Sequence, residues 1–222
     1  MTIKRHQDAE MAELQGITEE MANFCFTMLE LSFQNIGKYD QDVYDRIFDI
    51  EIEVNRHQMK IDDLAWKIIA LYQPTAGDLR NLIGTIKGAV DMERIADEIC
   101  TFCRRSMTLR NYQWKELPTT LFDLQNRVKE LLKNGFTAIF SKDVVLADSI
   151  LLADDSVDAL FQTLFEWIRD EMKKSPDRID TLLDFLSMGR SLERIGDHAT
   201  NLAEIAIFVE KGTDVRHHGL TF

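Results

Sequence analysis

Apolar residues recur along the chain at the spacing of long amphipathic helices. Between residues 42 and 71 the interval is seven residues, which is typical of a helix that packs one seam against its neighbours. The seam contains Ile47, Val54, Ile61 and Ile68, with Ile50, Leu64 and Leu71 on the alternate rung. No run of convincing length alternates between apolar and polar residues as a strand would. The pattern therefore predicts an all-α protein.

The same pattern occurs twice. The segment Met92-Glu93-Arg94-Ile95-Ala96-Asp97 is echoed one hundred residues later by Leu192-Glu193-Arg194-Ile195-Gly196-Asp197. A second seam also matches the first, with Ile150, Val157 and Leu164 set against Ala153, Leu160 and Trp167. A fixed-period echo indicates copies of one supersecondary unit. We therefore expect two tandem three-helix bundles related by internal duplication, one in residues 1–112 and the other in residues 113–222.

Each unit predicts three helices. In the first unit they cover about residues 8–36, 42–71 and 78–105, and in the second about 119–140, 143–173 and 178–210. The chain has only three prolines, Pro74, Pro118 and Pro176, and all three fall at predicted boundaries. Proline is tolerated at a helix start because its missing N–H would have no partner there. The prolines therefore support these boundaries.

Length and charge restrict the class of protein. A chain of 222 residues with 45% hydrophobic content can bury a substantial core. No apolar run reaches the ~18 residues of a membrane span, and the first residues lack the apolar core of a secretory signal. The net charge of −12 argues against nucleic acid, because affinity for phosphate backbones comes mostly from Lys and Arg. We expect a cytoplasmic protein that meets the membrane only through partners.

The cysteines and two of the histidines have ordinary structural interpretations. Cys25, Cys100 and Cys103 lie in apolar helical contexts and are expected to be reduced, buried thiols. Cys100 and Cys103 have the spacing of a metal or redox pair, but no second pair completes a zinc site. His57 lies on the seam and is expected to pack in the core, whereas His198 is expected on a polar face within a charge network.

Both copies place two carboxylates four residues apart on the third helix, namely Glu93 with Asp97 and Glu193 with Asp197. Like charges at this spacing destabilise a helix by ~0.2–0.5 kcal/mol, and partial burial raises the cost until a proton or cation compensates. On a helical wheel the first pair falls outside the charged stripe of its helix. Ion pairs three or four residues apart are expected along that stripe, which contains Arg80, Lys87, Asp91, Arg94, Glu98 and Arg105.

The middle helices offer facing partners for these pairs. They are Glu51 and Asn55 in the first copy, and Asp154 and Asp158 in the second. If the second and third helices pack antiparallel, oxygen atoms from both converge into a site of the kind used by helical-bundle di-metal proteins. Without histidine in the clusters, magnesium or manganese is suitable and iron is compatible. The alternative is that the carboxylates are solvated or pair with nearby arginines.

Longer motifs resemble a known family. Residues 67–80, Lys67-Ile68-Ile69-Ala70-Leu71-Tyr72-Gln73-Pro74-Thr75-Ala76-Gly77-Asp78-Leu79-Arg80, together with 91–98, Asp91-Met92-Glu93-Arg94-Ile95-Ala96-Asp97-Glu98, are similar to the first repeat of the PhoU family of bacterial phosphate-signalling proteins. Residues 192–201 resemble its second repeat, and the tail Gly212-Thr213-Asp214-Val215-Arg216-His217 also agrees. The resemblance covers essentially the whole chain.

This resemblance implies a homodimer that accompanies the Pst phosphate ABC transporter, through its ATPase subunit, and the sensor kinase PhoR. It implies repression of the phosphate-starvation regulon when phosphate is plentiful, and restraint of uptake. It also implies multinuclear clusters of iron, manganese, magnesium or zinc. The ligands implied are Glu93, Asp97, Glu193, Asp197, Asp154 and Asp158, with Glu51 and Asn55 departing from a strict double carboxylate.

Besides a regulatory adaptor, the residues leave two other functions open. No Gly-rich phosphate loop and no credible nucleophile–base spacing predicts catalysis, so a non-enzymatic adaptor is favoured. The alternative is a carboxylate-bridged metalloenzyme or metal-storage protein. Bundles of that kind typically use a Glu-x-x-His spacing, which neither Glu93 nor Glu193 has. A purely structural scaffold with empty acidic pairs is the third interpretation.

Overall fold

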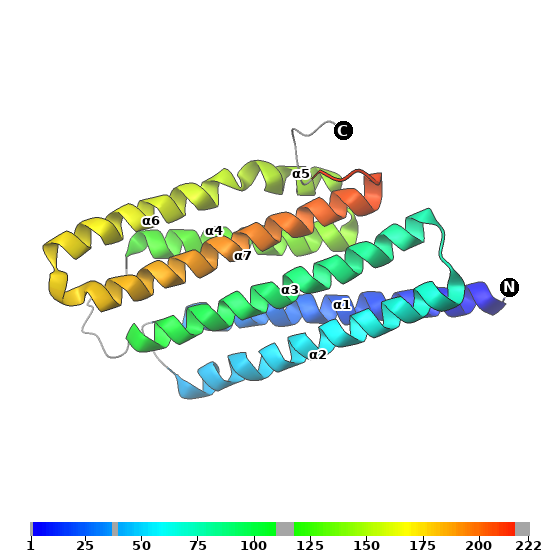
Figure 1. Ribbon diagram of the computed structural model, residues 1–222, viewed down its shortest axis with the longest axis horizontal. Helices are drawn as coiled ribbons and strands as arrows, with labels where there is room; N and C mark the ends of the chain where they lie inside the picture. The colour runs from blue at the N-terminus through cyan, green and yellow to red at the C-terminus, as the bar shows by residue number, and fades with distance from the viewer. Residues whose placement is uncertain (1, 37–39, 110–117, 216–222) are drawn as a thin grey trace.

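A computed structural model describes residues 2–36, 40–109 and 118–215, and the regular structure of these residues is entirely helical (Figure 1). The first repeat contains α1 (Thr2–Gln34), α2 (Gln41–Tyr72) and α3 (Ala76–Thr108). The second contains α4 (Thr119–Ser141), α5 (Val144–Ala153), α6 (Asp155–Lys174), a short 3₁₀ helix (Pro176–Arg178) and α7 (Ile179–Lys211). The predicted all-α fold with tandem bundles is confirmed. The predicted domain boundary, between residues 112 and 113, lies outside the described residues.

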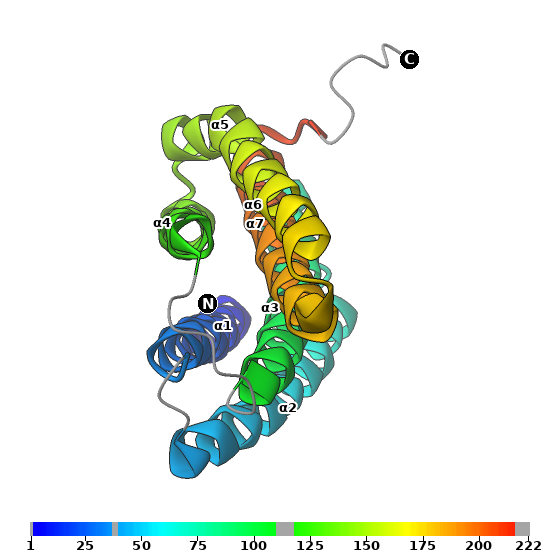
Figure 2. The ribbon, with the colours of Figure 1, turned by 90° about the vertical axis from the view of Figure 1, so that its left-hand side faces the viewer.

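The helices form two layers (Figure 2). One layer contains α1 and α4, and the other is a curved row in which α2, α3, α7 and α6 follow one another, with α5 continuing beyond α6. Within the first repeat α1 packs on α2 and α3, and within the second α4 packs on α5, α6 and α7. The third helices of the two repeats, α3 and α7, pack on each other at the centre.

Helix ends follow from local chemistry. The Asp40 carboxylate accepts hydrogen bonds from the backbone N–H groups of Asp42 and Val43 and caps α2, and Asp143 caps α5 through the N–H of Leu146. Left-handed residues end three helices, at Gln73, Lys142 and Gly212. Pro74, Pro118 and Pro176 lie just before α3, at the start of α4 and in the 3₁₀ helix, as predicted.

The heptad seam of α2 forms the centre of its packing face. Ile47, Val54, Ile61 and Ile68 are completely inaccessible to solvent, and the equivalent Ile150, Val157 and Leu164 are at most 1% exposed. The seam prediction is therefore confirmed in both copies. Leu71 was assigned to the alternate rung, but it is 63% exposed, one residue before α2 ends.

The prediction of one continuous helix over residues 143–173 is wrong. The helix breaks at Asp154, which follows the last residue of α5 and precedes the first residue of α6. There the backbone N–H of Val157 donates to the Asp154 carbonyl three residues back, and the Ser156 hydroxyl donates to the Ala153 carbonyl. Such local bonds interrupt the four-residue ladder and bend a helix.

The predictions for Cys and His57 are confirmed. All three thiols are buried, and burial raises the pKa of each, that of Cys100 to about 12. His57 is 5% exposed, with its Nδ1 2.8 Å from the Glu53 carbonyl and its Nε2 3.0 Å from Glu20. Buried thiols with raised pKa values are poor nucleophiles and poor metal ligands.

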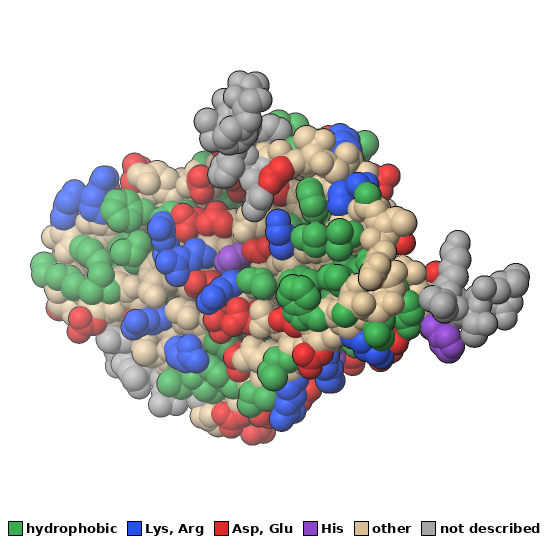
Figure 3. Space-filling view, turned by 45° about the vertical axis from the view of Figure 1, so that its right-hand side comes forward, with side chains coloured by type: hydrophobic (Ala, Val, Ile, Leu, Met, Phe, Trp, Pro, Cys, Tyr) green, Lys and Arg blue, Asp and Glu red, His purple; other side chains and the backbone are tan. Residues whose placement is uncertain are grey.

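Apolar side chains also reach the surface. On the face in Figure 3 they lie in several patches among acidic and basic side chains. The described helices include none with an uncharged apolar stretch long enough to pass through a lipid bilayer.

Candidate functional site

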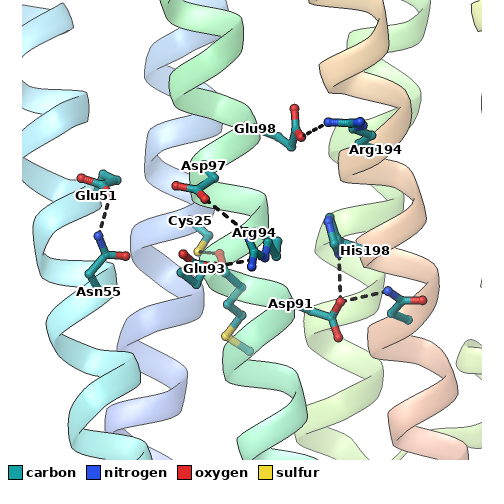
Figure 4. Close-up of polar contacts among 12 residues, drawn as sticks. Cys25, Glu51, Asn55, Asp91, Glu93, Arg94, Asp97, Glu98, Arg194 and His198 are labelled. Atoms are coloured by element: carbon teal, nitrogen blue, oxygen red, sulfur yellow. Dashed lines mark hydrogen bonds and ion pairs between the residues drawn. The ribbon is translucent and has the colours of Figure 1, made fainter.

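The predicted site residues of the first repeat lie on adjacent helices. Glu51 and Asn55 are on α2, and Glu93 and Asp97 are on α3, which packs against α2. Figure 4 shows Asp97 extending from α3 towards the side on which Glu51 and Asn55 lie. The Asn55 amide donates to Glu51 Oε1 over 2.6 Å, which fixes both side chains of α2.

Electrostatics connect the two helices of this first cluster. Burial raises the pKa of Glu93, and the carboxylates of Asp97 and Glu51 raise it further, against the opposing charge of Arg94. The Arg94 guanidinium lies 3.5 Å from Glu93 and 3.7 Å from Asp97, long distances for an ion pair. The carboxylates are thus close enough to repel one another and are only partly compensated by arginine.

The second repeat has a similar arrangement, with Asp154 at the junction of α5 and α6, Asp158 on α6, and Glu193 and Asp197 on α7. Burial raises the pKa of Glu193, and Asp197 and Asp158 add to the rise. Burial also raises the pKa of Asp197, followed by the effects of Asp154 and Asp158. All four predicted residues of this copy are therefore electrostatically coupled. Recurrence of the coupling in both copies indicates that it belongs to the duplicated unit.

Neighbouring residues that the sequence did not single out compensate part of this charge. The Thr200 hydroxyl of α7 lies 3.0 Å from Asp154 Oδ1 and links α7 to the break between α5 and α6. Arg190 lies 3.0 Å from Glu193. The sequence contained a signal for each, since Thr200 follows Asp197 by three residues and Arg190 precedes Glu193 by three, spacings that share a helix face.

The donor atoms suit a hard cation. Each cluster contains a buried oxygen without a hydrogen-bond partner among the described residues, Asn55 Oδ1 in the first and Glu193 Oε2 in the second. Unpaired buried oxygens beside carboxylates are suitable ligands for cations that prefer oxygen. Within the described part of the chain, however, no three His, Cys, Asp or Glu side chains lie close enough together to hold a metal. Binding would require these side chains to rotate towards one another, so metal binding stays a prediction.

The charged stripe of α3 differs from its prediction. Its main partners lie across the interface on α7: Glu98 contacts Arg194 at 2.8 Å, and Arg105 contacts Asp184 at 3.4 Å. Asp91 accepts from Asn201 over 2.9 Å and lies 2.8 Å from His198 Nδ1, which places His198 in the charge network expected for it. These residues of the stripe therefore join α3 to α7. The carboxylate pair of Glu93 and Asp97 lies on the other side of α3, away from this interface (Figure 4).

Comparison with known proteins gives consistent matches over both repeats. The PhoU domain matches residues 18–106 and 121–206. The phosphate-specific transport system accessory protein PhoU homolog of Pseudomonas aeruginosa is 34% identical over 222 residues, covering 99% of this chain and 91% of the relative. The accessory protein PhoU of Escherichia coli K12 is 28% identical over 223 residues, covering 99% of this chain and 92% of the relative.

Solved structures agree with these sequence matches. The crystal structure of PhoU from Pseudomonas aeruginosa superposes with a TM-score of 0.88 at 28% identity, covering 93% of this chain and 99% of that one. The phosphate transport system regulatory protein PhoU from Streptococcus pneumoniae gives 0.85 at 22% identity, covering 95% and 100%. Since the domain match, the full-length identity and the fold agree, this chain belongs to the PhoU family.

Proposed function

We propose that this chain regulates phosphate transport as an accessory protein without catalytic activity of its own. The observation that carries this proposal is the match of nearly the whole chain, across both repeats, to accessory proteins of the phosphate-specific transport system.

The partners follow from the family resemblance. The chain acts in the cytoplasm as a homodimer, and it contacts the ATPase subunit of the Pst transporter and the sensor kinase PhoR. Through these contacts it restrains uptake and represses the phosphate-starvation regulon when phosphate is plentiful. A net charge of −12 supports regulation through protein contacts rather than through DNA.

Metal binding would couple to these contacts. The residues that would hold cations are Glu51, Asn55, Glu93 and Asp97 in the first repeat, and Asp154, Asp158, Glu193 and Asp197 in the second. A bound cation supplies positive charge that relieves the repulsion between the carboxylates. Because each cluster spans two helices, neutralising it favours the arrangement in which those helices lie close together. A partner that prefers this arrangement binds more tightly when the cation is present.

The test is an affinity measurement on purified components. Binding of the chain to the transporter's ATPase subunit and to the cytoplasmic part of the kinase is measured with added manganese and with a chelator. We expect the metal-loaded chain to bind at least one partner more tightly, and substitution of either carboxylate cluster to remove the difference. Binding that is identical in both conditions would eliminate metal from the regulation, and absence of binding to both partners would contradict the adaptor role.

A further inference from the structure

The outer face of α2 bears a row of large apolar side chains that no described helix covers. Ile52, Met59 and Trp66 recur at seven-residue spacing and are 46%, 68% and 62% exposed. We call these three residues the outer stripe. The buried seam of α2 lies on the opposite side of the helix, where α1 and α3 pack. Because α2 stands at one end of the curved row of helices, the outer stripe lies at the edge of the molecule (Figure 2).

The duplication shows that the fold does not require apolar residues at these positions. The seams of the two copies align with Val54 opposite Val157. In that alignment Asp155, Gln162 and Arg169 of α6 stand where α2 has the outer stripe, and all three are exposed. Apolar side chains at seven-residue intervals are typical of a helix face that packs on another helix. The outer stripe is therefore a property of the first copy that the packing of one chain does not explain.

Charged residues beside the outer stripe make it complementary to itself. Arg56 lies three residues before Met59, and Asp63 lies four residues after it on the same flank of the helix. The apolar ends of the stripe are seven residues to either side of Met59. If a second copy of α2 lies antiparallel across a two-fold axis at Met59, residues equally far from that axis face each other. Ile52 then faces the second copy's Trp66, and Arg56 faces its Asp63, in both directions.

The exposure of the two charged side chains permits this pairing. Arg56 contacts Glu53 of its own helix, yet its side chain remains 62% exposed. Asp63 is also exposed. A parallel pairing of the two helices would instead set Asp63 beside the second copy's Asp62, and like charges across an interface are unfavourable. The charges therefore favour the antiparallel arrangement.

A second exposed apolar pair in the chain lacks this complementarity. Val145 and Leu152 of α5 are also seven residues apart and are 80% and 86% exposed. Asp148 lies between them, and α5 contains no Lys or Arg. Two antiparallel copies of α5 would thus bring like charges together near the axis. This pair provides a matched control for the outer stripe.

We propose that the outer stripe is the surface through which two copies of this chain pair antiparallel, with Arg56 of each copy bound to Asp63 of the other. The inference rests on the homodimer proposed above and assigns a surface to it. Trp, Met and Arg, the residue types found here, are enriched in protein interfaces, and Trp and Arg are frequent among the residues that contribute most to affinity.

Sedimentation equilibrium of the full chain tests this surface. Met59→Glu places two carboxylates at the proposed axis. Because each position occurs twice in a two-fold interface, we expect the dimer Kd to rise about a hundredfold. The control, Leu152→Glu, makes the same kind of change at an exposed position of α5 and should leave the Kd unchanged. A dimer that is insensitive to Met59→Glu would overturn the assignment and leave the homodimer standing, whereas a chain that is monomeric at every concentration would overturn both.

Charge exchange between copies supplies the second measurement. Arg56→Glu and Asp63→Lys each bring like charges together twice, so each variant alone should dimerise about tenfold more weakly. In an equimolar mixture, a heterodimer of the two variants pairs every charge with its opposite, and mixing should restore dimer formation. Positions 56 and 63 are too far apart on one helix to pair within a copy, so this rescue reports contact between copies. A mixture that dimerises no better than either variant would overturn the proposal.

Other occupants of the outer stripe would give a different result. If Met59→Glu left the dimer intact and abolished binding to the transporter's ATPase subunit, the stripe would serve that partner and the inference would be overturned. Loss of binding to vesicles of anionic phospholipid, again with the dimer intact, would overturn it in favour of a membrane surface.

Discussion

The guanidinium of Arg194 on α7 lies 2.8 Å from the carboxylate of Glu98 on α3 (Figure 4). Each of these residues directly follows a member of a carboxylate pair, since Arg194 follows Glu193 and Glu98 follows Asp97. The same helical turns that present the candidate ligands therefore also bind the two repeats together. A substitution at the candidate ligands on α3 or α7 is therefore next to the residues that join the two helices.

The Glu98–Arg194 pair should contribute measurably to stability. Glu98 is only 16% exposed and Arg194 is 55% exposed, so the pair is partly shielded from solvent. A double-mutant cycle with Glu98→Gln and Arg194→Gln, followed by urea unfolding, should give a coupling free energy of about 0.2–1 kcal/mol. The control cycle uses Asp170 and Lys173, which are 50% and 68% exposed and should show a weaker coupling because solvent screens both side chains. A zero value for Glu98 and Arg194 would show that this ion pair does not help to hold α3 on α7.

Removing the second carboxylate pair should eliminate metal from one repeat and leave the fold intact. Glu193→Ala with Asp197→Ala removes two ligands together with their mutual repulsion, so the unfolding temperature of metal-free protein should stay level or rise slightly. Elemental analysis of the purified protein should show less bound metal than in the unmodified chain. Glu166→Ala with Asp170→Ala, a pair at the same spacing on exposed α6 positions, is the control and should leave metal content unchanged. A large fall in unfolding temperature for the unmodified chain on chelation would show instead that the ions are structural.

The raised pKa values of Glu93, Glu193 and Asp197 predict a specific pH dependence. A carboxyl group whose pKa is higher in the folded state holds its proton more tightly there than in the unfolded chain. Its contribution therefore stabilises the fold at low pH and is lost as the pH rises from the ordinary carboxyl pKa, 4.5 for Glu, through the raised value. Urea unfolding of metal-free protein across this window should show a smaller decline with pH for Glu193→Gln with Asp197→Asn than for the unmodified chain.

Metal affinity should change in the opposite direction over the same window, because the ligands must be deprotonated to bind. Calorimetric titration with manganese should give tighter binding as the pH rises. Affinity that is independent of pH would show that Glu93, Glu193 and Asp197 are not the ligands.

Close approach of the repeats should make Gly84 intolerant of a side chain. A methyl group at Gly84 on α3 would overlap the Val209 side chain on α7 and lie 3.3 Å from Ile205. We expect Gly84→Ala to destabilise the protein by about 1–3 kcal/mol through overpacking. Gly16 on α1 has open space around it, so Gly16→Ala should stabilise by about 0.5–1 kcal/mol through helix propensity. A stabilising Gly84→Ala would show that the Val209 side chain or α7 itself can move aside at no cost.

Much of the fold could be predicted from periodicity because burial in this bundle follows the seven-residue pattern closely. Val54 and its equivalent Val157 were both assigned to the packing seam and are both buried. The break at Asp154 was missed because a bend leaves the apolar spacing intact on either side of it. The hydrogen bond of Ser156 to the Ala153 carbonyl is a local competition that hydrophobic patterning does not record.

The candidate clusters were found because they are duplicated, and the contacts around them were not. The Asp97 and Asp197 positions follow from the repeat and from helix geometry alone. The partner of Glu98 depends on which face of α3 meets α7, a property of the packing between repeats that no single helix specifies. For the same reason the ion pairs expected within the charged stripe of α3 connect to α7 instead.

The break between α5 and α6 gives the two carboxylate clusters different backbones, one on a continuous helix and one on a divided helix. Glu51 and Asn55 occupy successive turns of an uninterrupted helix, so the separation of their backbones is fixed. Asp154 stands at the junction and Asp158 in the first turn after it, so their separation varies with the bend angle. If the proposed cations bind, a change in this bend would alter the span of the second cluster, whereas the span of the first could change only through side-chain rotamers.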